Sequence, residues 1–238
     1  MDFWFSGDVQ SRFSLFSSSH MAMIVLYLVL LAAILLNYKK IAANQQLKNR
    51  IRWSFAGILI ISVVSYHTWM IVNDTWRLGH SLPLHITSLS GILAIFSLIT
   101  LNKKLIKMTF FIGFVSTGLA VITPDLAHDF PHYRYWQFFL HHIVVSVASL
   151  YLVLVIDLHI TLKHCLTVFG GLLVYALVIG VIVNPALDAN YLFLSGAPAN
   201  ETLLNHLGSG AIYIVSLVAI AFVVFLLSFG FYKLVKRV

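Results

Sequence analysis

The stretch FFLHHIVVSVASLYLVLVI, residues 138–156, decides the fold of this chain. It runs for 19 residues without Asp, Glu, Lys or Arg, which is about the length that an α-helix needs to cross the hydrocarbon core of a bilayer. Similar apolar runs recur along the chain, and residues 108–123 form the shortest of them. Together they predict seven spans: Met21–Tyr38, Ser54–Val72, Leu84–Leu101, Met108–Thr123, Phe138–Ile156, Leu166–Val183 and Ala211–Leu234.

The composition agrees with a membrane protein. Hydrophobic residues make up 60% of the 238 residues, charged residues make up 10%, and the mean hydropathy is +0.94. These values lie outside the range of soluble domains. Backbone groups in hydrocarbon must be paired within the segment, and the runs are long and not alternating, so helices are favoured over a barrel. We therefore expect an all-α polytopic bundle in which residues 1–238 form one transmembrane domain.

The orientation follows from the cationic residues. By this span assignment, twelve of the fifteen Lys and Arg residues lie on one side, after spans one, three, five and seven, whereas only Arg12, Arg77 and Arg134 lie on the other. Since Lys and Arg accumulate in cytoplasmic loops, the N-terminus is predicted outside and the C-terminus inside. The same clustering explains the net charge of +7 without a nucleic-acid partner. The positive cluster follows span one, which predicts an anchor that stays in the mature protein.

Four histidines stand in the outer halves of the predicted spans. They are His67, His85, His141 and His142. An ionisable residue inside a span is costly and usually faces a partner or a cavity. Four of them at one depth favour a shared polar cavity.

Helical spacing separates the two adjacent histidines. His142 shares a face with Ser146 and Ser149, whereas His141 shares a less polar face that begins at Gln137. We therefore expect His142 to face the interior of the bundle.

A second candidate residue lies on the third span. Thr87 shares a face with Ser90, Gly91 and Ala94, and small residues of this kind suit a crevice or a close helix contact. A Thr hydroxyl becomes a nucleophile when a base takes its proton, and imidazole is a common base. Thr87 and His142 form such a pair if their helices meet. Otherwise Thr87 bonds its own helix backbone, and His142 bonds a neighbouring carbonyl.

No standard soluble enzyme motif accompanies this pair. The chain holds no phosphate loop, dinucleotide fingerprint, nucleophile elbow or metalloprotease motif. Its single cysteine, Cys165, provides no disulfide framework. We expect no cofactor and no bound metal.

Several motifs resemble those of a known family. LPLH at Leu82–His85 enters span three, and TPD at Thr123–Asp125 follows span four. FPHYRYWQFF at Phe130–Phe139 leads into span five, and NYLFL at Asn190–Leu194 is followed by Pro198. From about span two to span seven, these motifs resemble the YwaF-type bacterial integral membrane proteins.

The resemblance implies lipid acyl chemistry. The YwaF-type proteins are similar to eukaryotic transmembrane acyltransferases that remodel ether phospholipids, and more remotely to androgen-induced membrane hydrolases. The acyltransferases use Cys and His, and the hydrolases use Thr and His. YwaF-type proteins commonly carry Cys two positions after the Pro-Leu-His motif, where this chain has Thr87. The family His falls on His142. The resemblance thus implies a lipid acyltransferase or acyl-ester hydrolase, multi-pass in a bacterial plasma membrane, with phospholipid as its substrate or its solvent.

The outer loops supply further candidates. Arg134, His132 and Asp125 are expected to bind a phosphate headgroup, because Arg binds phosphate through two parallel hydrogen bonds. Asn190 and Tyr191, in the matching motif before span seven, are counted with them as substrate-binding residues. The alternative is a salt-bridge network that anchors the loop before span five.

Two other functions stay open at this point. One is a zinc-dependent hydrolase in which His67, His85, His142 and an outer Asp hold a metal that activates water. The other is a transporter or sensor of a lipid or small molecule, although transporters often have interrupted helices or paired repeats, and the sequence shows neither.

Overall fold

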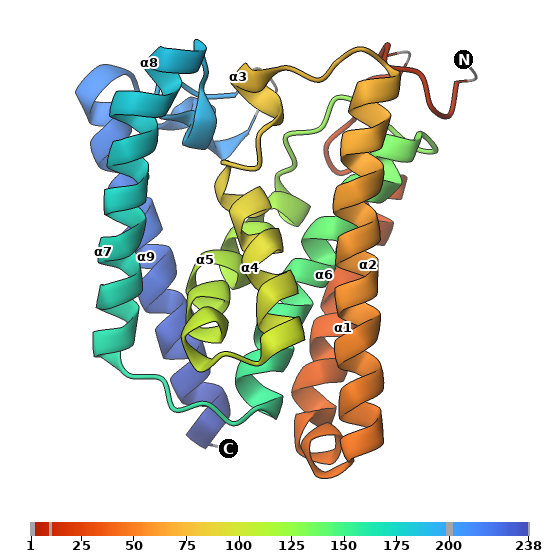
Figure 1. Ribbon diagram of the computed structural model, residues 1–238, viewed down its shortest axis with the longest axis vertical. Helices are drawn as coiled ribbons and strands as arrows, with labels where there is room; N and C mark the ends of the chain where they lie inside the picture. Colours follow the sequence, from red (N-terminus) through yellow and green to blue (C-terminus); the bar gives the residue numbers. More distant parts are fainter. Residues whose placement is uncertain (1–2, 10, 199–201, 238) are drawn as a thin grey trace.

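The computed structural model describes residues 3–9, 11–198 and 202–237, and these residues form a bundle of helices (Figure 1). The α-helices are α1 (Ser18–Ala43), α2 (Gln45–Val72), α3 (Leu78–Ser81), α4 (Ile86–Thr100), α5 (Lys103–Ile122), α6 (Tyr133–Val155), α7 (Leu162–Val178), α8 (Asn184–Leu187) and α9 (Gly210–Arg237). Helices α1, α2, α5, α6 and α7 each begin after a polar residue whose side chain accepts a hydrogen bond from the first turn.

The structure bears out a polytopic membrane bundle. Six helices are long and apolar enough to cross a membrane, and α4 is a shorter apolar helix of 15 residues. The expectation that span four is the shortest was wrong, because α5 extends to 20 residues and α4 is the short one. The two ends of the chain lie at opposite ends of the bundle (Figure 1), as an odd number of crossings requires.

Helix α6, which contains the apolar run at 138–156, is the centre of the bundle. It contacts α1, α2, α4 and α5, and nearly all of its side chains are buried. A helix that is apolar on all sides suits such a position. Helices α7 and α9 lie together at one side of the bundle (Figure 1). Many of their apolar side chains are exposed, as lipid-facing residues would be.

Helix α4 is short because both of its ends are fixed by other parts of the chain. Pro83 precedes it in the non-helical segment that follows α3. At its other end Leu101 adopts the left-handed conformation, and Arg52 of α2 donates to the carbonyl groups of Leu98 and Ile99. Since the last carbonyls of a helix have no partner within it, Arg52 acts as a C-terminal cap. In Figure 1, α4 begins lower in the view than the upper ends of α2 and α7, on the side of the bundle that is predicted to be the outer one.

Helix α7 is interrupted near its outer end. It passes into a π-helical segment, Ile179–Val183, and then into α8. Pro185 stands in the first turn of α8 and lacks a backbone N–H, so the regular hydrogen-bond ladder cannot continue through it. The apolar run at Leu166–Val183 predicted an uninterrupted span here.

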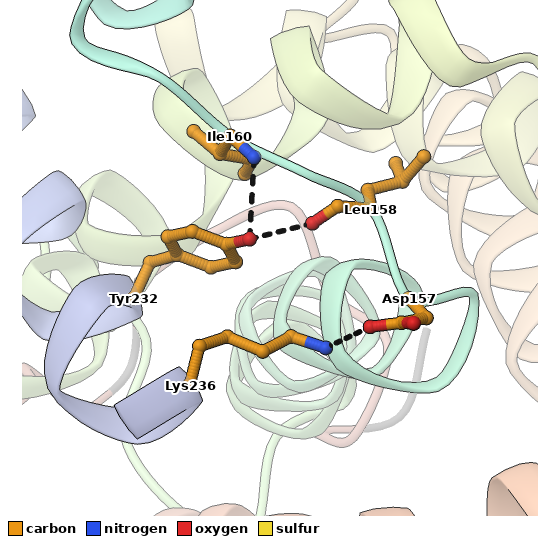
Figure 2. A network of polar contacts seen from close by, with 5 residues as sticks. All are labelled: Asp157, Leu158, Ile160, Tyr232 and Lys236. Carbon is orange, nitrogen blue, oxygen red and sulfur yellow. Dashed lines mark hydrogen bonds and ion pairs between the residues drawn. The ribbon is translucent and has the colours of Figure 1, made fainter. Parts of the chain in front are cut away.

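The inner end of α9 is attached to the loop that follows α6. Figure 2 shows the Tyr232 hydroxyl between two backbone groups of this loop: it donates to Leu158 O at 2.6 Å and accepts from Ile160 N at 3.2 Å. Lys236 forms an ion pair with Asp157. Because Tyr232 is buried and Asp157 is exposed, the hydroxyl contributes more to stability than the ion pair does.

We expect Tyr232→Phe to destabilise the bundle by about 1–3 kcal/mol, because it leaves a buried N–H and a buried carbonyl without their partner. Tyr213 is the matched control. It lies on the same helix and is equally buried, at 4% exposure against 5%, but within the described part of the chain its hydroxyl has no partner. Tyr213→Phe should therefore leave thermal unfolding in detergent unchanged or raise its midpoint. Equal losses for the two variants would contradict the role of the Tyr232 hydroxyl.

Candidate catalytic site

Thr87 lies in the first turn of α4, and this position explains why its hydroxyl does not bond the helix backbone. Elsewhere in the spans, Thr68, Thr100 and Thr117 each donate to the carbonyl one turn back. For Thr87 that carbonyl belongs to Pro83, which precedes the helix. In the described part of the chain the Thr87 hydroxyl forms no hydrogen bond to its own helix, unlike the hydroxyls of those three residues. The alternative in which Thr87 bonds its own backbone is therefore not observed.

The small-residue face of α4 packs closely against α5 and α6, as its composition predicts. Gly91 lies against the ring of His141, and Ser90 lies against Gly113 of α5. Ala94, one turn further on, is fully buried. Thr87 is four residues before Gly91 and so shares this face, one turn nearer the outer end. The expectation of a close helix contact is confirmed.

His142 is buried in the bundle, with 8% of its surface exposed. Its Nδ1 lies 2.7 Å from the carbonyl oxygen of Phe138, and its ring stacks on the Phe138 ring at 4.0 Å. A carbonyl only accepts hydrogen bonds, so Nδ1 is the donor, and the Nε2 of the neutral ring is left as an acceptor. The alternative in which His142 bonds a neighbouring carbonyl predicted this contact. The same contact places the proton on Nδ1, and a base that acts through Nε2 requires that tautomer.

His141 is equally buried, and it is this histidine that contacts other helices. Its Nδ1 lies 3.3 Å from the Ser62 hydroxyl of α2, and its ring edge lies over Gly91 of α4. From the helical spacing, His141 was expected on a less polar face and was not a candidate site residue. That face is polar because α2 supplies Ser62, and the spacing along α6 carries no signal for a partner on another helix.

A chain of polar contacts continues from Ser62 toward the outer end of α6. The Gln137 amide nitrogen donates to the Ser62 hydroxyl at 3.0 Å and to the Ser62 carbonyl at 3.3 Å. Arg134 in turn donates to the Gln137 amide oxygen. The Arg134 guanidinium also lies 3.9 Å from the centre of the Tyr66 ring, a cation–π contact. We call the four side chains Arg134, Gln137, Ser62 and His141 the relay.

Arg134 also lines an outer cavity. This cavity has a volume of about 260 Å³ and lies between α2, α3 and the loop that precedes α6. Its polar and aromatic groups suit a small charged headgroup. Its lining residues are Tyr66, Trp69, Met70, Thr75, His80, Asp125, Leu126, Ala127, His128 and Arg134. Two of the three predicted headgroup residues, Asp125 and Arg134, therefore meet at one cavity.

His132, the third, lies behind the cavity wall. Its Nε2 donates to Ser6 O at 3.0 Å, its Nδ1 accepts from Arg134 N, and its ring stacks on His128 at 4.1 Å. It thus caps the start of α6. Burial, and then the nearby His132 and Arg134, lowers the pKa of His128 to about 4, and burial is also the main cause that lowers the pKa of His132. Both rings are therefore neutral at pH 7, and Arg134 is the main positive charge beside Asp125.

Asn190 and Tyr191 are not among the lining residues of that cavity. Asn190 closes its own loop through Ser195 N and Gly196 O, each at 2.9 Å. The buried Tyr191 hydroxyl donates to Leu78 O at 2.5 Å and accepts from Leu82 N at 3.0 Å. The Tyr191 bonds thus hold the segment between α3 and α4, whereas the Asn190 bonds lie within its own loop.

The three histidines of the alternative zinc site occupy separate surroundings. His67 accepts from the Trp76 indole at 3.4 Å, and the His85 ring packs against Tyr191 and Phe193. Across residues 3–9, 11–198 and 202–237, no three His, Cys, Asp or Glu side chains are grouped in a way that could hold a metal ion. The arrangement gives that alternative no support.

At Gly91, α4 lies in close contact with α6. A Cβ atom at this position would lie 2.6 Å from Nε2 and 2.7 Å from Cε1 of His141, whose ring is held by Ser62. We expect Gly91→Ala to destabilise the protein by about 1–3 kcal/mol through overpacking. Gly57→Ala on α2 is the control, because nothing lies within 4 Å of its Cβ. If thermal unfolding in detergent gave Gly91→Ala the same midpoint as Gly57→Ala, the close packing would be refuted.

The structure thus brings His141 of α6 against Gly91 of α4, one turn from Thr87, and links His141 through Ser62 and Gln137 to Arg134 at the outer cavity. A model of the TMEM164 family, a family of transmembrane proteins, matches residues 15–229. No curated protein and no solved structure gave a significant match. Because the matched region covers most of the sequence, the chain belongs to the TMEM164 family.

Proposed function

We propose that this TMEM164-family protein transfers or hydrolyses the acyl chain of a membrane phospholipid, with Thr87 as the nucleophile and His142 as the general base. The observation that carries the proposal is that the Thr87 hydroxyl forms no hydrogen bond to its own helix within the described part of the chain. This hydroxyl lies in the first turn of a shortened span, without a carbonyl of its own helix to bond, on the face that packs against α6. A hydroxyl in this state has a proton that a base can take.

His142 supports the proposal through its tautomer. Its Nδ1–H is held by the Phe138 carbonyl, which leaves Nε2 free to accept a proton. A catalytic histidine is commonly oriented in this way, by a group that fixes the nitrogen not used in catalysis.

The proposed reaction has two balanced steps. In the first, His142 Nε2 takes the proton of the Thr87 hydroxyl, and Oγ1 attacks the ester carbonyl carbon. The bond from that carbon to the glycerol oxygen breaks, the leaving oxygen receives the proton from His142, and an acyl-threonine ester remains. In the second, a hydroxyl of an acceptor lipid or of water gives its proton to His142 and attacks this ester. The Thr87 hydroxyl is restored by the same proton.

The start of α4 is suited to stabilise the oxyanion that forms in both steps. The first backbone N–H groups of a helix have no partner within it and favour negative charge. At α4 the N-cap residue is His85, whose side chain forms no cap hydrogen bond. The N–H groups next to Thr87 are therefore available as donors, an arrangement that lowers the barrier to acyl transfer in many enzymes.

The outer cavity is the proposed headgroup site. Arg134 supplies a cation beside it, and a guanidinium suits a phosphate group. This cavity lies on the outer side of the relay and of His141, so a phospholipid with its phosphate at Arg134 would extend its ester region toward the outer halves of α4 and α6.

The proposal is tested with the purified protein in vesicles that contain a phospholipid labelled in its acyl chain and an unlabelled lysophospholipid. We expect the label to move to the lysophospholipid, or to appear as free fatty acid, at a rate proportional to the amount of protein. If the label stayed on the donor through long incubation, acyl chemistry would be refuted, and binding of the lipid without turnover would favour a sensor or a transporter.

A further inference from the structure

The hydrogen bonds of the relay have a defined direction, and this direction fixes the proton on His141. Arg134 has only donors, so the Gln137 atom that faces it is the amide oxygen. The Gln137 nitrogen then faces Ser62, where the backbone carbonyl is only an acceptor. The contacts at both ends of the amide therefore give the same assignment of its oxygen and nitrogen, and Gln137 donates to Ser62.

The Ser62 hydroxyl accepts from Gln137 and has its own proton to place. Within the described part of the chain, its other contact is Nδ1 of His141, at 3.3 Å. The hydroxyl therefore donates to Nδ1, so that Nδ1 is an acceptor. In a neutral imidazole the proton is then on Nε2. This tautomer is opposite to that of the adjacent His142.

The Nε2–H of His141 is directed at α4. This nitrogen lies over Gly91, one turn from Thr87 on the same face of the helix. In the described part of the chain Nε2 forms no hydrogen bond. It is also not sealed from the surface, because the Tyr213 hydroxyl is the only fully enclosed side-chain polar atom without a partner among the described residues. The hydrogen on Nε2 therefore has no acceptor within the described part of the chain, beside the helix face that carries Thr87.

We propose that His141 is a second catalytic histidine, which donates its Nε2–H to the carbonyl oxygen of the bound ester and to the oxyanion that forms from it. Gln137 and Ser62 are its positioning residues. This inference rests on the proposed function, and it divides the work between the two neighbours: His142 moves the proton, and His141 stabilises the charge. A neutral histidine donor can fill such a role in a site that excludes water.

One isosteric substitution tests the direction of the relay. In Gln137→Glu, the carboxylate still accepts from Arg134 but cannot donate to Ser62. The Ser62 hydroxyl then donates to the carboxylate and accepts from His141, which moves the imidazole proton to Nδ1. The size of the side chain is preserved, so a purely structural role would leave the tautomer unchanged. Gln45→Glu on the exposed start of α2 is the matched control.

The tautomer is read by nitrogen NMR of the ¹⁵N-histidine-labelled protein in vesicles, with the His141 signals identified by their loss in His141→Gln. We expect Nε2–H in the wild type and in Gln45→Glu, and Nδ1–H in Gln137→Glu. In the vesicle acyl-transfer assay we expect kcat to fall about tenfold or more in Gln137→Glu with KM little changed, as for a donor that acts in the transition state.

Two results would overturn the inference. One is a wild-type His141 that carries its proton on Nδ1. The other is Gln137→Glu with the switched tautomer and undiminished turnover. The NMR result does not depend on turnover and decides the direction of the relay by itself. A wild type without acyl-transfer activity would refute the proposed function, and with it the catalytic role of His141.

Discussion

Thr87→Ala is expected to reduce acyl transfer by about 10³-fold or more, as the loss of a nucleophile does in other enzymes that form acyl intermediates. The methyl group fills part of the space of the threonine side chain, and alanine is the best helix former, so α4 should remain intact. The vesicle assay with a labelled phospholipid measures the loss.

Two companion variants show whether the hydroxyl itself is needed. Thr87→Ser keeps a hydroxyl and should retain turnover. Thr100→Ala removes a hydroxyl from the exposed, opposite end of the same helix, where it bonds Phe96 O, and should leave turnover unchanged. Full activity in Thr87→Ala would remove this residue from the mechanism, whatever the other two variants do.

His142→Gln is expected to lower turnover by about 10²- to 10⁴-fold, which is the usual contribution of a general base. Glutamine is similar in reach and its amide nitrogen can donate to Phe138 O as Nδ1 does, but no atom of it takes up a proton near neutral pH. The thermal unfolding midpoint should therefore change little while turnover falls.

His67→Gln is the control for this second prediction. His67 lies at similar depth on α2 and bonds the Trp76 indole, outside the proposed site. We expect it to keep turnover near the wild-type level. A large loss in His67→Gln, combined with retained turnover in His142→Gln, would favour a mechanism centred on α2 and would contradict the base assigned here.

Much of the fold was predictable from the sequence, because a membrane span is specified locally. Apolar runs predicted seven spans, and these correspond to the six long apolar helices and the shorter α4, whereas the central place of α6 was not predicted. The length of α4 was not predictable in this way. It depends on Arg52 from α2 at one end and on the segment held by Tyr191 at the other, and these contacts join residues far apart in the sequence.

The part of the candidate site that depends on the residues of a single helix face was predictable. The spacing of Ser90 and Gly91 indicated a close contact, and the structure has one there. The contact of His141 with Ser62 was missed, since Ser62 belongs to another helix. The unbonded state of the Thr87 hydroxyl was also missed, because it depends on where α4 begins.

The central claim is that Thr87 carries the acyl group between donor and acceptor. Mass spectrometry of the protein, quenched in acid shortly after mixing with phospholipid and then digested, tests it most directly. We expect one acyl chain esterified to the peptide that contains Thr87, and no such adduct in His142→Gln. Continued turnover with no acyl group on Thr87, or with the acyl group on another residue, would contradict the claim.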